Sequence, residues 1–158
     1  MQKITPCLWF DTQAEEAAKL YTSIFKNSKI KATSHYPEGS PAPTGSVMTV
    51  VYELDGQEYM NLNAGPIFKF TEAISFVVNC DDQAEVDYFW EKLTADGGEE
   101  SQCGWLRDKF GLSWQITPKQ LNALMSDPDP KKASNTMQAM LTMKKLDLAA
   151  LQAAHDKE

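Results

Sequence analysis

The sequence predicts an α+β fold: paired β-α-β-β-β modules with extra C-terminal helices. The main observation is an internal repeat, in which residues 4–15 and 74–85 align at a constant offset of 74 − 4 = 70 residues. The two copies share Ile, Asp, Gln, Ala and Glu at matching places. Repeated segments of this kind are the sequence signature of repeated structural units. The 158 residues suit one domain. We expect module one over residues 1–70, module two over 71–117 and a helical appendage over 118–158.

Each copy of the repeat continues into a segment with the apolar spacing of an amphipathic helix. The apolar face after the first copy comprises Ala14, Ala17, Ala18, Tyr21 and Phe25, and the face after the second comprises Val86, Phe89, Trp90 and Leu93. A capping box is expected at each start, Thr12 with Glu15 and Asp82 with Glu85. We expect the helices to end near residues 27–28 and 97–98.

Strand and turn signals follow each predicted helix. Residues 46–54 are rich in β-branched and apolar side chains, Asp55-Gly56 is a strong hairpin signal, and residues 58–63 predict the return strand. In the second half we expect a strand over 103–108, a turn at 109–111 and a return strand over 112–117. The Pro- and Gly-rich residues 36–45 predict a loop that the second half lacks. We expect the two modules to form a curved mixed sheet.

The repeat ends at Pro118, and three helices are expected beyond it. One spans residues 119–125 and ends before Asp127-Pro128-Asp129-Pro130. A second carries Ala133, Met137, Met140, Leu141 and Lys144, and Asp147 is expected to cap a third that ends near Ala154. The methionines of this tail, Met125, Met137, Met140 and Met143, predict core packing, a dimer contact or an adaptable ligand wall.

Composition excludes several classes of protein. Lys plus Arg is 15 against 22 Asp plus Glu, a net charge of −7, which argues against binding to nucleic acid and to anionic membrane surfaces. No apolar run approaches the roughly 20 residues of a membrane span, and the first residues lack the apolar stretch of a signal peptide. We therefore expect a soluble, cytoplasmic protein.

Candidate reactive residues are few. Cys7, Cys80 and Cys103 are widely spaced and form no C-x-x-C pair, so each is expected to be a reduced structural thiol. His35 and His155 are expected at the surface, and Asp108 and Lys109 in a solvated turn. Neither a Ser-His-Asp arrangement nor a histidine-rich metal site has support in the sequence.

Paired β-α-β-β-β modules are typical of the vicinal oxygen chelate superfamily, the glyoxalase/bleomycin-resistance/dioxygenase fold. The residues that carry a closer resemblance to its PhnB-like branch are Pro6-x-Leu8-x-Phe10-Asp11, Asp55-Gly56-Gln57, Leu62 to Pro66 and Phe68 to Phe76, and above all Cys103 to Gln115. With the tail Asp127 to Pro130 and Met137-x-Ala139-Met140-Leu141, the chain resembles the 3-demethylubiquinone-9 3-methyltransferase-like subgroup over nearly its whole length. The resemblance implies that the cup is built either within a dimer or by joining two modules, and the Met-rich tail leads us to expect a homodimer.

The methyltransferase name conflicts with the residues. A Rossmann-type methyltransferase needs a Gly-rich turn between a strand and a helix so that its backbone can approach the cofactor. The sequence has 8 glycines but no such motif, and Gly97-Gly98 follows a predicted helix rather than a strand. We therefore expect no AdoMet binding.

The resemblance also implies a cup in which metal-using members of the superfamily place His and Glu ligands on the first and last strands of each module. Here the repeat puts Thr5 or Pro6, Ser75, Asn61 and Gln115 at those positions. Amide and hydroxyl oxygens are poor ligands for zinc, nickel or iron. We expect no functional metal and no cofactor.

The cup can still bind an unknown small molecule. Strand alternation predicts a lining whose members are Leu8, Phe10, Asn61, Ser75, Val77, Trp105 and Gln115, and Cys103 is added as a neighbour. Trp9 and Trp114 are expected on the other face. Two alternatives stay open: the aromatic side chains can fill the core, and Asn61 can pair with Gln115 as a structural bridge. Three functions remain: a metal-independent binding protein of the sequestering kind, a superfamily lyase, isomerase or dioxygenase with atypical ligands, and an interaction module.

Overall fold

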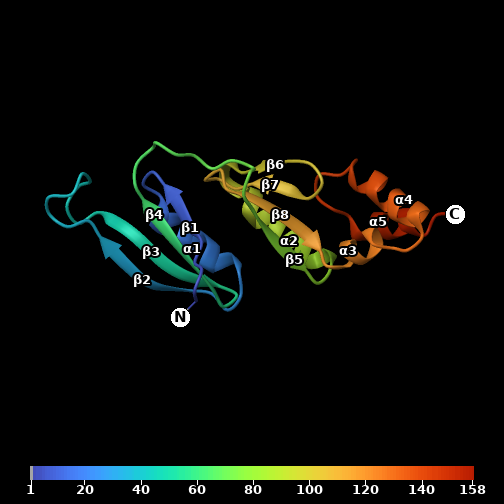
Figure 1. Cartoon of the computed structure of the whole chain (residues 1–158), viewed down its shortest axis with the longest axis horizontal. Helices are drawn as coiled ribbons and strands as arrows, with labels where there is room; N and C mark the ends of the chain where they lie inside the picture. The colour runs from blue at the N-terminus through green and yellow to red at the C-terminus, as the bar shows by residue number, and fades with distance from the viewer. Residues whose placement is uncertain (1) are drawn as a thin grey trace. The chain divides into compact units, whose positions relative to one another are not determined.

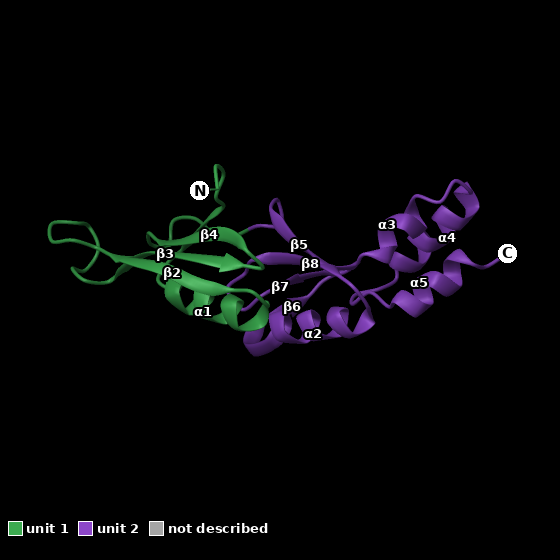
Figure 2. Ribbon diagram, turned by 90° about the horizontal axis from the view of Figure 1, so that it is seen from below, with its two compact units in different colours: residues 1–70 green, residues 71–158 purple. Residues whose placement is uncertain are grey.

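The computed structural model describes residues 2–158, which divide into two compact units. Unit 1 spans residues 1–70 and unit 2 spans residues 71–158 (Figures 1 and 2). Unit 2 contains a second β-α-β-β-β module, whose strands lie between Ser75 and Pro118, followed by three helices. The α+β class and the two repeated modules with extra C-terminal helices are confirmed.

In unit 1 one helix packs on a four-stranded sheet with strand order β1-β4-β3-β2. Its elements are β1 (Cys7–Phe10), α1 (Ala14–Ile24), β2 (Lys29–His35), β3 (Val47–Leu54) and β4 (Gln57–Asn63). Strand β1 pairs with β4 in parallel, and the other pairs are antiparallel. Asp55 and Gly56 both adopt positive φ, so the predicted hairpin turn is confirmed. No bounds were predicted for β2, which is mostly polar and is exposed except at Ser34.

In unit 2 the sheet has the equivalent order β5-β8-β7-β6. Its elements are β5 (Ser75–Cys80), α2 (Gln83–Thr94), the short 3₁₀ helix η1 (Ala95–Gly97), β6 (Glu99–Glu100), β7 (Trp105–Arg107) and β8 (Ser113–Pro118). Strand β5 pairs in parallel with β8, as β1 does with β4. Hydrogen-bonded strand pairing therefore gives two four-stranded sheets rather than the single sheet expected.

The two module helices begin in different ways. Asp82 caps α2 as predicted, since its side chain accepts a hydrogen bond from the Glu85 backbone N–H at 2.9 Å. At α1 the predicted Thr12 cap is wrong: the N-cap residue is Gln13, and Asn63 on β4 accepts from the Ala14 N–H at 2.8 Å. The first helix therefore needs the folded sheet to satisfy its first turn.

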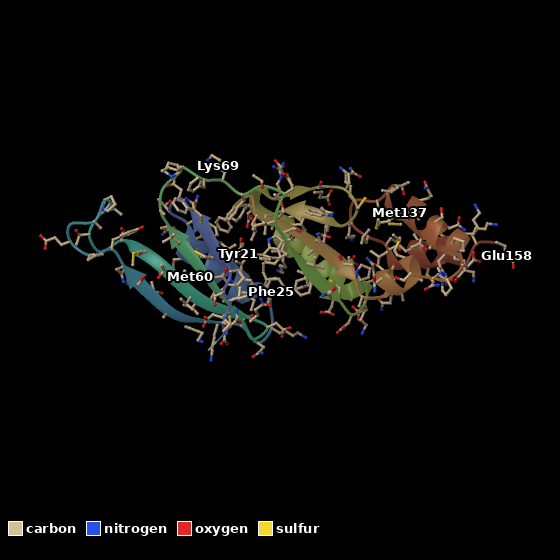
Figure 3. The ribbon with its side chains drawn as sticks, in the orientation of Figure 1. Tyr21, Phe25, Met60, Lys69, Met137 and Glu158 are labelled. Carbon is tan, nitrogen blue, oxygen red and sulfur yellow. The ribbon has the colours of Figure 1, made fainter. Side chains whose placement is uncertain are left out.

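The appendage consists of α3 (Gln120–Met125), α4 (Pro130–Met140) and α5 (Leu148–His155). Asp147 caps α5, as expected, by accepting from the Ala150 N–H at 3.0 Å. Leu124, Leu146 and Leu151 form a buried cluster, and Met140 and Met143 pack against it, which is the core role predicted for methionine. Met137 (Figure 3) and Leu141 are exposed instead. Among the described helices, none combines the length and apolar character that a bilayer crossing needs.

Candidate functional site

In unit 2 the sheet has one face against α2 and a distal face on the opposite side. The face against α2 carries Phe76, Trp114 and Leu106. The Trp90 indole of α2 donates to Glu100, the register partner of Leu106. Side chains alternate along a strand, so the neighbouring residues lie on the distal face. We define the distal face of unit 2 as Ser75, Val77, Trp105 and Gln115.

Three of these residues form a row across three strands. Gln115 on β8 is the register partner of both Val77 on β5 and Trp105 on β7. Val77 is 51% exposed, whereas Trp105 and Gln115 are half-buried. The Gln115 amide Nε2 donates to the Ser75 hydroxyl at 2.9 Å. The row therefore combines an aromatic ring, an exposed aliphatic side chain and an oriented amide, in the register that the sequence predicts for module two.

A second, polar row of residues lies beside the first on the distal face of unit 2, two residues earlier on β8. Ser75 is aligned with Ser113, and Ser113 with Arg107. Ser113 is buried, and its hydroxyl has no hydrogen-bond partner among the described residues. The Arg107 guanidinium pairs with Glu72 and Glu99, so its charge is already neutralised.

In unit 1 the predicted alternation is off by one residue. Leu8, Phe10 and Asn61 are buried on the face against α1, not on the distal face. Asn61 accepts from the Tyr52 hydroxyl at 2.8 Å and donates to the Ala14 carbonyl of α1 at 3.0 Å. Both groups of its amide are thus used inside unit 1, and the proposed bridge to Gln115 is wrong. The physical reason is that residues 7–10 are all apolar, so their pattern does not distinguish the two faces.

The distal face of unit 1 consists of Cys7, Trp9, Met60 and Leu62, which alternate with the buried positions of β1 and β4. Cys7 is the register partner of Met60, as Val77 is of Gln115. Met60 (Figure 3) therefore takes the place in unit 1 that Gln115 takes in unit 2. Trp9 packs edge-on against Phe68, with ring centroids 4.8 Å apart, and its indole donates to the Gly65 carbonyl. The expectation that Trp9 lies on the opposite face to the cup is wrong.

Unit 1 also contains an ion-pair cluster on its sheet that the sequence did not predict. The Lys31 ammonium lies 3.0 Å from a Glu58 carboxylate oxygen and 3.4 Å from Glu53. Thr5 donates to Glu58 as well. The hydrogen bond from Lys31 lowers the pKa of Glu58, and the bonds to Glu58 and Glu53 raise the pKa of Lys31. The cluster spans β2, β3 and β4. The Asp55-Gly56 turn predicts that β3 pairs with β4, but no local pattern of the sequence specifies how β2 pairs with β3.

The donor chemistry does not fit the metal that the superfamily implies. With the observed register, the positions that correspond to the superfamily's metal ligands are occupied by Thr5 and Met60 in unit 1 and by Ser75 and Gln115 in unit 2. Glu58 lies on the same face of β4, two residues before Met60. Glu58 is the one carboxylate in this set, and it is already paired with Lys31. Zinc, nickel and iron prefer imidazole, thiolate or carboxylate. Over residues 2–158, no three His, Cys, Asp or Glu side chains gather as a metal site.

The cysteines lie in three different environments. Burial and the nearby Glu85 raise the pKa of the Cys80 thiol to about 12, so this thiol stays protonated. Cys103 is not in a strand: it adopts φ +59° in the turn before β7, and its N–H donates to the Met143 carbonyl at 2.8 Å. Cys7 is exposed at the start of β1. Cys103 therefore borders the row at Trp105 without being part of the sheet face.

Two polar residues that were expected in solvent are buried. Asp108 is only 3% exposed, and it accepts hydrogen bonds from the Phe110 and Leu112 N–H groups and from the Trp114 indole, at 2.9–3.1 Å. His155 is also buried, between Asp127 and Asp156, whereas His35 is exposed as expected. Both predictions were wrong because a polar side chain can be buried when its hydrogen bonds are satisfied.

The sequence matches the model of the family described as 3-demethylubiquinone-9 3-methyltransferase over residues 2–117. Helices α3, α4 and α5 lie outside that match. No curated protein matches the sequence.

Among solved structures, a PhnB protein from Bacillus cereus that carries the same methyltransferase name is 39% identical. The match covers 74% of this chain and 99% of that one, with a TM-score of 0.68. The protein PA1353 from Pseudomonas aeruginosa is 20% identical, with 75% and 98% of the two chains covered and a TM-score of 0.63. The fosfomycin resistance protein FosX from Listeria monocytogenes is 16% identical over 77% and 94% of the chains, with a TM-score of 0.53. The last two show similarity of fold alone.

Proposed function

Because the chain belongs to the 3-demethylubiquinone-9 3-methyltransferase family, a PhnB-like branch of the vicinal oxygen chelate superfamily, we propose that it binds a small organic molecule without a metal ion. The proposed site is the distal face of unit 2. One observation carries the proposal: Val77, Gln115 and Trp105 lie in one row on the face away from α2, with Val77 51% exposed. Apolar and aromatic walls with a few oriented polar groups are the usual composition of ligand sites.

The chemistry of the row indicates the kind of ligand. The Trp105 ring offers a flat apolar surface for stacking, and such aromatic pairs contribute about 0.5–1.5 kcal/mol beyond burial. The Gln115 carbonyl oxygen can accept a hydrogen bond from the ligand while its amide nitrogen donates to Ser75. A flat, partly aromatic molecule with an N–H or O–H group fits this set best.

Methyl transfer is not the function that we propose. The segments between strand and helix, residues 11–13 and 81–82, contain no glycine, so neither forms the turn that lets a backbone approach a dinucleotide-like cofactor. Each sheet also mixes parallel and antiparallel pairs, unlike a doubly wound parallel sheet. Titration calorimetry with AdoMet is expected to give no binding heat, and a saturable heat would overturn this part of the proposal.

Ligand screening with matched variants tests the site. Native protein is screened by thermal shift against flat aromatic acids, amides, quinones and antibiotics, and hits are titrated by tryptophan fluorescence. Trp105→Ala and Gln115→Leu are each expected to weaken binding of a hit at least about tenfold, which corresponds to about 1.4 kcal/mol. Tyr88→Ala, on the exposed side of α2, is the control and is expected to bind normally. A hit that binds Trp105→Ala and Gln115→Leu with the same affinity as the wild type argues against this site.

The alternative is a superfamily enzyme that uses atypical metal ligands. Native mass spectrometry of freshly purified protein separates the two functions, because a bound metal and an organic adduct add different masses. Stoichiometric metal that survives dialysis would overturn the metal-independent proposal. An organic adduct in a metal-free protein would support it and would identify the ligand.

We also propose that the protein is a cytoplasmic homodimer. Exposed Met137 and Leu141 in the helical appendage are the apolar residues on which this proposal rests. Sedimentation velocity measures the assembly directly: the dimer is expected in the wild type and a monomer in the Met137→Lys/Leu141→Lys variant. A wild-type monomer at tens of micromolar would contradict the proposed assembly.

A further inference from the structure

The appendage contains a histidine held between two carboxylates. His155, the last residue of α5, is 9% exposed. Its Nε2 lies 2.8 Å from Asp127 Oδ2 in the turn between α3 and α4, and its Nδ1 lies 2.8 Å from Asp156 Oδ1. A carboxylate only accepts hydrogen bonds, so both ring nitrogens must donate at once. Only the protonated imidazolium has two N–H groups, and the arrangement therefore requires the charged ring.

The charged groups around the ring come from each element packed against it. Asp127 belongs to the α3–α4 turn, Asp156 follows α5, and Lys132 of α4 lies close enough to both carboxylates to interact with their charge. Asp127 also accepts from the Asp129 N–H, and Gln152 donates to Asp156 at 3.0 Å. The Asp129 N–H and the His155 ring lower the pKa of Asp127, and the His155 ring and Gln152 lower the pKa of Asp156. Because Asp129 and Gln152 keep donating, the carboxylates stay ionised when His155 titrates.

The rest of α5 is attached differently. At its start, Gln83 of α2 donates to the Leu146 carbonyl at 3.0 Å and accepts from the Leu148 N–H at 2.7 Å. In its middle, Leu151 is fully buried against Leu124 and Leu146. At its end, His155 bonds Asp127 in the α3–α4 turn, and Asn135 of α4 donates a long hydrogen bond to the Lys157 carbonyl. Only the last of these three attachments can be altered by a proton.

We propose that Asp127, His155 and Asp156 form a proton-dependent latch that closes the end of α5 over the apolar cluster of the appendage. When the imidazole loses its proton, one ring nitrogen becomes an acceptor facing a carboxylate, and that contact turns repulsive. The end of α5 then separates from the α3–α4 turn, and the cluster around Leu124 and Leu151 becomes accessible. The latch does not depend on the proposed ligand site.

The direction of the pH dependence follows from the contacts of the ring. Hydrogen bonds to Asp156 and Asp127 raise the pKa of His155 above its ordinary value of 6.5. A raised pKa in the folded state means that the latch contributes its full stability below pH 6.5 and loses it as the pH rises through the folded pKa. Mildly alkaline conditions therefore open the latch.

Nuclear magnetic resonance of the full chain tests the latch. The imidazole carbons of His155 are expected to titrate at higher pH than those of a histidine in an unstructured peptide. Amide exchange of residues 150–156, corrected for the intrinsic pH dependence of exchange, is expected to accelerate several-fold between about pH 6 and 9. Amides of α2 serve as the internal reference and are expected to keep their protection over the same range.

Variants decide whether the histidine is the cause. His155→Gln is expected to abolish the pH dependence of α5 exchange, and the matched His35→Gln variant is expected to retain it. Asp156→Asn keeps the shape of the latch and is expected to lower the pKa of His155, which provides a second test if His155→Gln does not fold. The proposal is overturned if His155 titrates at or below the peptide value, or if α5 exchange has the same pH dependence in His155→Gln as in the wild type.

Discussion

Units 1 and 2 pack one helix across a four-stranded sheet of equivalent strand order, yet each relies on a different kind of buried polar group. In unit 1, Asn61 connects β3 and β4 through Tyr52 of the same hairpin, and it connects both strands to α1 through the Ala14 carbonyl, 47 residues away. In unit 2, Asp108 binds groups only two to six residues away. Equivalent topology therefore does not imply equivalent anchoring: unit 1 depends on long-range contacts, whereas unit 2 contains a local, self-contained turn.

The largest effect is expected from the local anchor. Asp108→Ala removes the acceptor of three hydrogen bonds in a buried turn, which should lower the free energy of unfolding by about 3–5 kcal/mol. Chemical denaturation of the purified variant measures this loss. Asp108→Asn keeps one acceptor oxygen and should cost less, and equal losses in the two variants would show that the hydrogen bonds are not the source.

The long-range anchor is expected to contribute less, because fewer groups lose their partners. Asn61→Leu should lower the free energy of unfolding by about 2–3 kcal/mol, and Tyr52→Phe by about 1 kcal/mol. The double variant should lose less than the sum, because the Tyr52 hydroxyl that Asn61→Leu would leave unpaired is gone. Strictly additive losses, measured in the same denaturation series, would contradict a direct Tyr52–Asn61 coupling.

The two helix caps extend the comparison at a smaller scale. Asp82→Ala and Asn63→Ala should each lower the free energy of unfolding by about 1 kcal/mol. They should differ in isolated peptides: helicity of a peptide spanning residues 81–95 should fall on Asp82→Ala, because that cap is local. A peptide spanning residues 12–26 lacks Asn63 altogether. Circular dichroism that shows the second peptide to be as helical as the first would indicate that α1 does not need its cap from β4.

The smallest effect concerns the ion pair on β2–β4. Hydrogen bonding to Lys31 lowers the pKa of Glu58, so the pair contributes stability above the unfolded pKa of a glutamate and loses it as the pH falls through the lower, folded value. Thermal melts of Glu58→Gln should differ from wild type at neutral pH and converge with it in acid. If the difference in melting temperature between Glu58→Gln and wild type grows toward acid, the ion pair does not lose its stabilising effect at low pH and the predicted pH dependence is wrong.

Sequence patterns were sufficient for much of the fold. The repeat, the Asp55-Gly56 turn, the Asp82 and Asp147 caps and the apolar face of α2 are local or periodic signals, and the structure contains all of them. The cap of α1 was wrong because its acceptor comes from Asn63, 49 residues away along the chain. The β-α-β-β-β module implied strand β2 but not its bounds, because this exposed edge strand contains only two apolar residues, Ile30 and Ala32.

The face of each strand that its residues occupy was predicted correctly only where the sequence pattern distinguishes the two faces. In module two, Phe76, Trp114 and Leu106 alternate with Ser75, Gln115 and Trp105, and the register came out as expected. In module one, four consecutive apolar residues gave no preference, and the predicted register was wrong by one residue. A shift of one residue exchanges the two faces of a strand, so Met60 and Trp9 replaced Asn61 and Phe10 on the distal face.

The sequence by itself determined the paired modules and the helical appendage, because these depend on residue type and spacing along the chain. Only the tertiary structure decided which side of each strand meets its helix, where Asp108 and His155 are buried, and which carboxylates hold the His155 ring. Those features depend on partners brought together by folding, and spacing along the chain does not specify such contacts.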